Sequence, residues 1–180
     1  MNTKRVTKIL WIATTLTLAA TAVAQPFTRD DWNRAGYVLG TRCQIVNLQT
    51  GKFLDLDGAK ILQASSEAEG AFQWEIRKSP AGGPARYRIV HGSTGLVMTE
   101  RPSPVAKKPS TLVAMAASDD DTNQDWRIES YGDGSVMLIA ASGKALDVPS
   151  GNRRDGIALQ TFLRNGASNQ RFLLKPDPKH

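Results

Sequence analysis

The chain has 180 residues, 22% of them charged, and a formal net charge of +6 at pH 7. This length supports one domain with a substantial hydrophobic core and rarely two. The basic residues are scattered, and the doublets Lys107-Lys108 and Arg153-Arg154 have no interleaved aromatic residues, so the composition does not support nucleic acid binding.

The first 24 residues have the pattern of a secretory signal peptide. Three basic residues precede an apolar stretch over 9–20, and Ala22-Val23-Ala24 forms a small-residue cleavage site. We therefore expect cleavage after Ala24, a secreted or periplasmic protein, and no membrane contact after cleavage. The leader carries three basic residues and no acids, so the mature chain would have a net charge of +3. An uncleaved N-terminal anchor is the alternative.

Residues 25–41 form an N-terminal arm that precedes the first strand. Two interpretations are open: a short helix around Asp30–Ala35 that packs Trp32 and Tyr37 onto the domain, or a partly disordered segment. Cys43 is the only cysteine of the chain, so no internal disulfide is expected. We expect this thiol to be a small buried hydrophobe and not a nucleophile.

From Arg42 onward, short apolar runs interrupted by turn-forming residues predict an all-β domain. The predicted strands are Cys43–Val46, Phe53–Asp57, Ile61–Ala64, Trp74–Arg77, Tyr87–His91, Leu96–Thr99, Thr111–Met115, Trp126–Glu129, Val136–Ala140, Ala145–Val148, Ala158–Phe162 and Phe172–Lys175. A Pro/Lys-rich insertion over 101–109 predicts an extended loop.

One motif occurs three times along these strands. Each copy opens with a Ser/Thr-Gly turn at Gly51, Gly95 or Gly143 and an apolar strand, and it closes with an aromatic residue at Trp74, Trp126 or Phe172. A repeat at nearly equal spacing is typical of an architecture built from similar units.

These repeats resemble the ricin B-type β-trefoil lectins, the R-type lectins related to family 13 carbohydrate-binding modules. The resemblance covers residues 42–176, leaving 177–180 as a tail. It implies an all-β fold, a β-trefoil of three four-stranded repeats with pseudo-threefold symmetry. It also implies that Trp74, Trp126 and Phe172 pack together in the core, and that the function is carbohydrate binding.

The resemblance places a sugar site in the third repeat, where every position of the family's pattern is matched. Asp147 would hold a pair of hydroxyl groups, because charge-assisted hydrogen bonds to a carboxylate are strong. Gln160 would contact the sugar edge and Phe162 would stack on its apolar face. Asn169 would bond a ring hydroxyl, while Gln170 would brace the carboxylate of Asp147.

The first repeat matches less well. Asp55 and Gln63 suggest a weak second site, but Ser65 replaces the aromatic residue and Ala71-Phe72 replaces the Asn-Gln pair. We expect little or no binding there.

The second repeat lacks the pattern. We place Met98 at the acid position and Ala114 at the glutamine position, so that only Asn123-Gln124 remains, in a structural role. The acidic run over 119–121 lacks the alternating spacing of a calcium loop, and we expect no metal ion and no cofactor.

The leading hypothesis is an exported lectin for galactose-type or related saccharides, and not an enzyme. His91 and His180 have no visible nucleophilic partner, and no metal cluster or nucleophile motif is present. The alternative is a protein-interaction trefoil, a toxin accessory subunit or protease inhibitor with a decayed sugar site. A single weak pocket would gain avidity by self-association or through a partner protein.

Overall fold

A computed structural model describes residues 25–26, 28–34, 36–65, 73–83, 85–101 and 110–179. The predicted signal peptide, Ala71-Phe72 and residues 102–109 of the Pro/Lys loop lie outside the described residues. None of the helices in the described ranges is both long and apolar enough to span a lipid bilayer.

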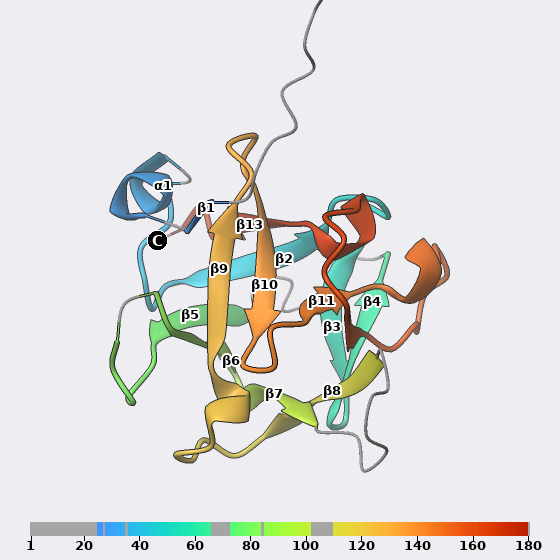
Figure 1. Cartoon of the computed structure of the whole chain (residues 1–180), viewed down its shortest axis with the longest axis horizontal. Helices are drawn as coiled ribbons and strands as arrows, with labels where there is room; N and C mark the ends of the chain where they lie inside the picture. The colour runs from blue at the N-terminus through green and yellow to red at the C-terminus, as the bar shows by residue number, and fades with distance from the viewer. Residues whose placement is uncertain are drawn as a thin grey trace, which may run out of the picture.

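The described chain is mostly β-strand, and its strands follow the three predicted repeats (Figure 1). The first repeat contains β2 (Arg42–Asn47), β3 (Phe53–Asp57), β4 (Lys60–Ala64) and β5 (Trp74–Lys78). The second contains β6 (Tyr87–His91), β7 (Val97–Arg101), β8 (Ser110–Ala116), η1 (Thr122–Gln124) and β9 (Trp126–Ser130). The third contains β10 (Ser135–Ala140), β11 (Ala145–Asp147), η2 (Pro149–Gly151), β12 (Gln160–Phe162), η3 (Ser168–Gln170) and β13 (Phe172–Pro176).

The first and fourth strands of each repeat close into a barrel. Strand β2 pairs with β5, β5 with β6, β6 with β9, β9 with β10, β10 with β13, and β13 again with β2. Because each of these strands has a neighbour on both sides, the ring has no free edge. The second and third strands of each repeat form hairpins, and β8 pairs with both β4 and β12. This arrangement confirms the predicted β-trefoil.

The closing aromatics of the repeats lie in one buried core. Trp74, Trp126 and Phe172 have no exposed surface. Each indole also places its polar edge on a backbone carbonyl: Trp74 Nε1 donates to the oxygen of Leu54 at 3.0 Å and Trp126 Nε1 to that of Met98 at 2.9 Å. A buried indole N–H needs such a partner, so these residues serve the core and not a ligand.

Cys43 is buried, as the sequence predicts. Its side chain lies in the core with no exposed surface, and burial raises the pKa of its thiol to about 12. A thiol of this kind carries almost no reactive thiolate at neutral pH.

The N-terminal arm is ordered where the structure describes it. Strand β1 (Gln25–Pro26) pairs with β9, and helix α1 (Arg29–Arg34) follows (Figure 1). The centroid of the Trp32 ring lies 5.2 Å from that of the Tyr37 ring and 5.5 Å from that of the Tyr87 ring. The backbone N–H of Ile76 in β5 donates to the Tyr37 hydroxyl at 2.8 Å, so the arm packs onto the barrel and the first of the two interpretations holds.

Candidate functional site

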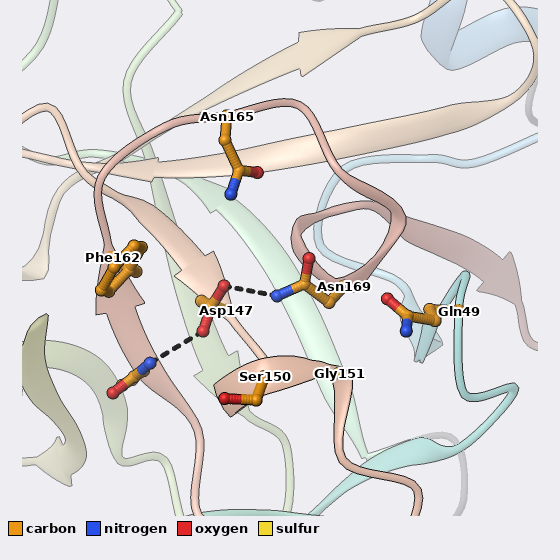
Figure 2. Close-up of a pocket in the computed structure, with 8 residues that line it drawn as sticks. Gln49, Asp147, Ser150, Gly151, Phe162, Asn165 and Asn169 are labelled. Atoms are coloured by element: carbon orange, nitrogen blue, oxygen red, sulfur yellow. Dashed lines mark hydrogen bonds between the residues drawn. The ribbon is translucent and has the colours of Figure 1, made fainter.

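The third repeat contains a cavity of about 320 Å³ beside strand β11 (Figure 2). It is lined by Gln49, Asp147, Ser150, Gly151, Gln160, Phe162, Asn165 and Asn169. Four of the five residues predicted for this site are therefore in its wall, and Gln170 lies buried behind Asp147. The volume is at the lower end of the range of small-molecule pockets.

Strand pairing explains how Asp147, Gln160 and Phe162 come together. In the β11–β12 hairpin, Asp147 lies opposite Gln160 and Ala145 lies opposite Phe162. Alternate residues of a strand point to the same face, so Asp147, Gln160 and Phe162 share one face of the hairpin. The chain then turns sharply in η2, where Ser150 has a φ of +53° and Gly151 a φ of +60°. A non-glycine residue in this region of backbone space is uncommon and often marks a functional turn.

Three side-chain amides converge on the carboxylate of Asp147. Asn169 Nδ2 donates to Oδ1 at 2.7 Å and Gln170 Nε2 donates to the same oxygen at 3.2 Å. Gln160 Nε2 donates to Oδ2 at 2.8 Å. A carboxylate has roughly four acceptor positions, so Oδ2 can still accept one more hydrogen bond.

The carboxylate of Asp147, which accepts three amide hydrogen bonds, supplies the charge of the cavity wall. Asp147 is only 2% exposed, and burial raises its pKa, while the amide hydrogen bonds act in the opposite direction. Of the residues that line the cavity, Asp147 alone is charged. The wall therefore presents one negative acceptor, several neutral polar groups and the half-buried ring of Phe162.

The Asn169-Gln170 pair has a partly different arrangement from the one expected. Asn169 uses its Nδ2 on Asp147 and on the Val148 carbonyl at 3.1 Å, which leaves its Oδ1 as the atom for a ligand. Gln170 also holds the loop before η3, because its Nε2 donates to the Leu163 carbonyl at 2.9 Å and its Oε1 accepts from Asn165 N at 3.0 Å.

The structure does not bring Asp55 and Gln63 together in the first repeat. The register of β3 and β4 sets Asp55 opposite Leu62 and Gln63 opposite Leu54, so Asp55 and Gln63 point to opposite faces of the hairpin. Gln63 is fully buried and donates through Nε2 to the Arg154 carbonyl at 2.7 Å. It supports the segment after η2 and does not face a ligand.

The second repeat requires a correction of register. Trp126 bonds the carbonyl of Met98 as Trp74 bonds that of Leu54, so Met98 is a core residue and the acid position belongs to Thr99. Met98 has no exposed surface, in agreement with this assignment. Ala114, opposite Thr99, does occupy the glutamine position. The acidic run over 119–121 is exposed, and no cluster of His, Cys, Asp or Glu in the described ranges is arranged to hold a metal ion.

Sequence reasoning missed four residues of the cavity wall: Gln49, Ser150, Gly151 and Asn165. The Pro-Ser-Gly sequence after Asp147 is a turn signal that could have indicated two of them. Gln49 belongs to the first repeat, and no local signal connects it with Asp147.

Comparison with known proteins gives a family for part of the chain and a fold for most of it. Residues 122–180 match the family described as ricin-type β-trefoil lectin domain-like. No curated protein matches this sequence.

Among solved structures, the designed three-fold symmetric protein ThreeFoil is 28% identical, with a TM-score of 0.64 over 75% of this chain and 97% of that one. The Macrolepiota procera ricin B-like lectin, solved in complex with lactose, is 16% identical, with a TM-score of 0.64 over 78% of this chain and 98% of the lectin. An exo-β-1,3-galactanase from Clostridium thermocellum is 24% identical with a TM-score of 0.67, and the match covers 78% of this chain but 32% of the enzyme.

Proposed function

We propose that this chain, which carries a ricin-type β-trefoil lectin domain, is a carbohydrate-binding protein whose main site is the cavity of the third repeat. One observation carries the proposal: three amides hold the Asp147 carboxylate in the cavity wall and leave one acceptor position on Oδ2, beside the Phe162 ring. The family match over 122–180, which includes all five predicted site residues, supports it.

The chemistry of the site suits a pyranose. A sugar hydroxyl would donate to Asp147 Oδ2, and this bond to a charged acceptor is the strongest that the wall offers. Asn169 Oδ1 and the Gln160 amide would contact neighbouring hydroxyls. Phe162 would cover the apolar C–H face of the ring and exclude water. Preorganised amides lower the cost of ordering the site when the sugar binds.

The preferred ligand in this proposal is a neutral, galactose-type or related saccharide. Asp147 is the only charged residue of the wall, so a uronate or a sulfated sugar would meet like charge without a basic partner. Sugars carrying an anionic group should therefore bind less well than their neutral counterparts.

Catalysis is not part of the proposal. His91 is 5% exposed, and its ring nitrogens contact Thr94 Oγ1 and Gln73 Oε1, while burial lowers its pKa. Cys43 is inside the core. Neither residue is next to the cavity of the third repeat. We also propose export through cleavage after Ala24, on the signal-peptide pattern of the sequence.

The test is a glycan and polysaccharide binding screen on the chain beginning at Gln25, with two variants measured in parallel. Asp147→Ala should abolish binding. Asp55→Ala is the matched control, because Asp55 also lies four residues after its turn glycine, but in the part of the chain that the structure describes no side-chain amide donates to its carboxylate, which accepts from the backbone N–H of Leu56. The control should bind as the unmodified protein does.

Thermal unfolding of each variant separates loss of the site from loss of the fold. If the folded Asp147→Ala variant binds as well as the unmodified protein, the assignment of the site to the third repeat is refuted. Binding lost in Asp55→Ala instead would move the site to the first repeat. No binding by the folded, unmodified protein would favour the protein-interaction trefoil.

A further inference from the structure

One side of the cavity wall comes from a different repeat. Gln49 follows β2 in the first repeat, whereas the rest of the wall belongs to the third. In Figure 2, Gln49 lies on the far side of Asn169 from Asp147 and Phe162, so the wall continues beyond the amide cradle. The proposed contacts with a single pyranose involve only the Asp147 and Phe162 end.

Asn47 fixes the first repeat against the third at this point. It is fully buried, and its Nδ2 donates to the Asn169 carbonyl at 3.0 Å. Its Oδ1 accepts from the backbone N–H groups of Gln49 and Thr50, each at 3.1 Å. One buried side chain therefore positions the backbone of Gln49 relative to that of Asn169.

The side chain of Gln49 is also held in place. Ser168 Oγ donates to Gln49 Oε1 at 3.3 Å, which orients the amide. On the other side, Gly151 lies against this amide, and a Cβ atom added to Gly151 would overlap it unless the Gln49 side chain moved. In the part of the chain that the structure describes, no acceptor is bonded to Gln49 Nε2. Gln49 thus offers a positioned N–H donor in the cavity wall.

We infer that Gln49 is a specificity-determining residue that donates a hydrogen bond to the second residue of a neutral oligosaccharide, whose terminal residue lies against Asp147 and Phe162. This inference rests on the proposed function. The exposed Ser150 of the strained η2 turn lies between the two ends of the wall and offers a hydroxyl along the same path (Figure 2). The ligand class is neutral because the extended wall adds amide and hydroxyl groups and no charge.

The experiment measures the affinities of two pairs, methyl β-galactoside with lactose and xylose with xylobiose, and of the methyl glycoside of N-acetylgalactosamine, by titration calorimetry. Gln49→Ala should weaken binding of the disaccharide about three- to tenfold, the worth of one hydrogen bond, and leave the monosaccharide unchanged. Gln49→Glu keeps the size and the acceptor for Ser168 but removes the N–H groups, so it should show the same selective loss. Asp147→Ala should abolish binding of both the monosaccharide and the disaccharide of each pair.

The outcomes separate this inference from the proposed function. A Gln49→Ala variant that affects both members of a pair equally, or neither, would overturn the inference while the lectin function stands. Selective loss of the N-acetylgalactosamine methyl glycoside, with lactose unaffected, would assign Gln49 to a substituent of the first sugar and also overturn it. Failure of the unmodified protein to bind any of these sugars would overturn both proposals.

Discussion

Two buried glutamines at equivalent positions allow the proposed sugar site to be tested separately from the stability of the fold. Gln170 and Gln124 are 0% and 1% exposed, and each holds the loop before a 3-10 helix. Gln124 Nε2 donates to the Ala117 carbonyl at 2.7 Å and its Oε1 accepts from Asp119 N at 3.2 Å. Gln170 makes the same pair of loop contacts and, in addition, donates to the Asp147 carboxylate. Gln124 has the guanidinium of Arg88 as its charged partner instead.

Replacing either glutamine with Ala should destabilise the protein by about 2–4 kcal/mol. Each change removes two bonds to loop backbone and one to a charged group, at about 0.5–1.5 and 1.5–3 kcal/mol, with partial compensation by water. For a chain of this size, this corresponds to a fall in Tm of about 4–16 °C. Differential scanning calorimetry measures it directly.

Sugar affinity should distinguish the two variants. Gln170→Ala removes one of the hydrogen-bond donors to Asp147 Oδ1. It should weaken sugar binding about tenfold, which corresponds to roughly 1.4 kcal/mol of binding free energy. Gln124→Ala should leave affinity unchanged at a temperature where both variants are folded. Equal losses of affinity in the two variants would refute the reasoning, because the effect would then come from the fold and not from the carboxylate.

Three other predictions concern the core and the charge of the site. Trp126→Ala should cost about 3–5 kcal/mol in the free energy of unfolding, measured by denaturant titration, because the indole is fully buried; a loss below about 1 kcal/mol would place it outside the core. The Cys43 thiol should resist alkylation in the native protein and react after unfolding, and rapid native labelling would contradict its burial. Burial raises the pKa of Asp147, so the carboxylate takes up a proton at a higher pH than the ordinary value of about 3.9. Sugar affinity, measured by binding titrations across pH, should therefore fall on acidification before the pH reaches that value. The contribution of this carboxyl group to the free energy of unfolding should be lost as the pH rises through its raised pKa, which unfolding titrations across pH would test.

Strand positions in this chain could be predicted because each apolar run is bounded by turn formers that act locally. All twelve predicted strands are present, with ends that differ by at most two residues. The burial of Trp74, Trp126 and Phe172 was equally predictable, since repeated aromatics of this size are most stable in a shared core.

Register was harder to predict than position. A shift of one residue moves a side chain to the other face of a hairpin, and this is the error made for Gln63 and for Met98. Counting from the turn glycine would have corrected the second case, because Asp55 and Asp147 both lie four residues after theirs and Thr99 lies four after Gly95.

The burial of Asp147 and the role of Gln49 could not be predicted from the sequence. Asp147 is buried where amides from two separate segments, Gln160 in β12 and Asn169-Gln170 in η3, converge on it, and nothing in the local sequence of either segment indicates this contact. Gln49 reaches the cavity only because β13 pairs with β2 and brings the two ends of the domain together. Both features belong to tertiary structure.

The pairing of β13 with β2 also bears on when the proposed sugar site can form during folding. Phe172 lies opposite Asn47 in this pairing, so the contact that closes the barrel is also among the most distant along the chain. Contacts between distant segments slow folding, because the loop entropy must be lost before they stabilise the structure. A chain still missing its last strand would have the Asp147 hairpin but no closed barrel and no Asn47 bridge to Asn169. Ligand recognition should therefore be among the last properties this protein acquires as it folds.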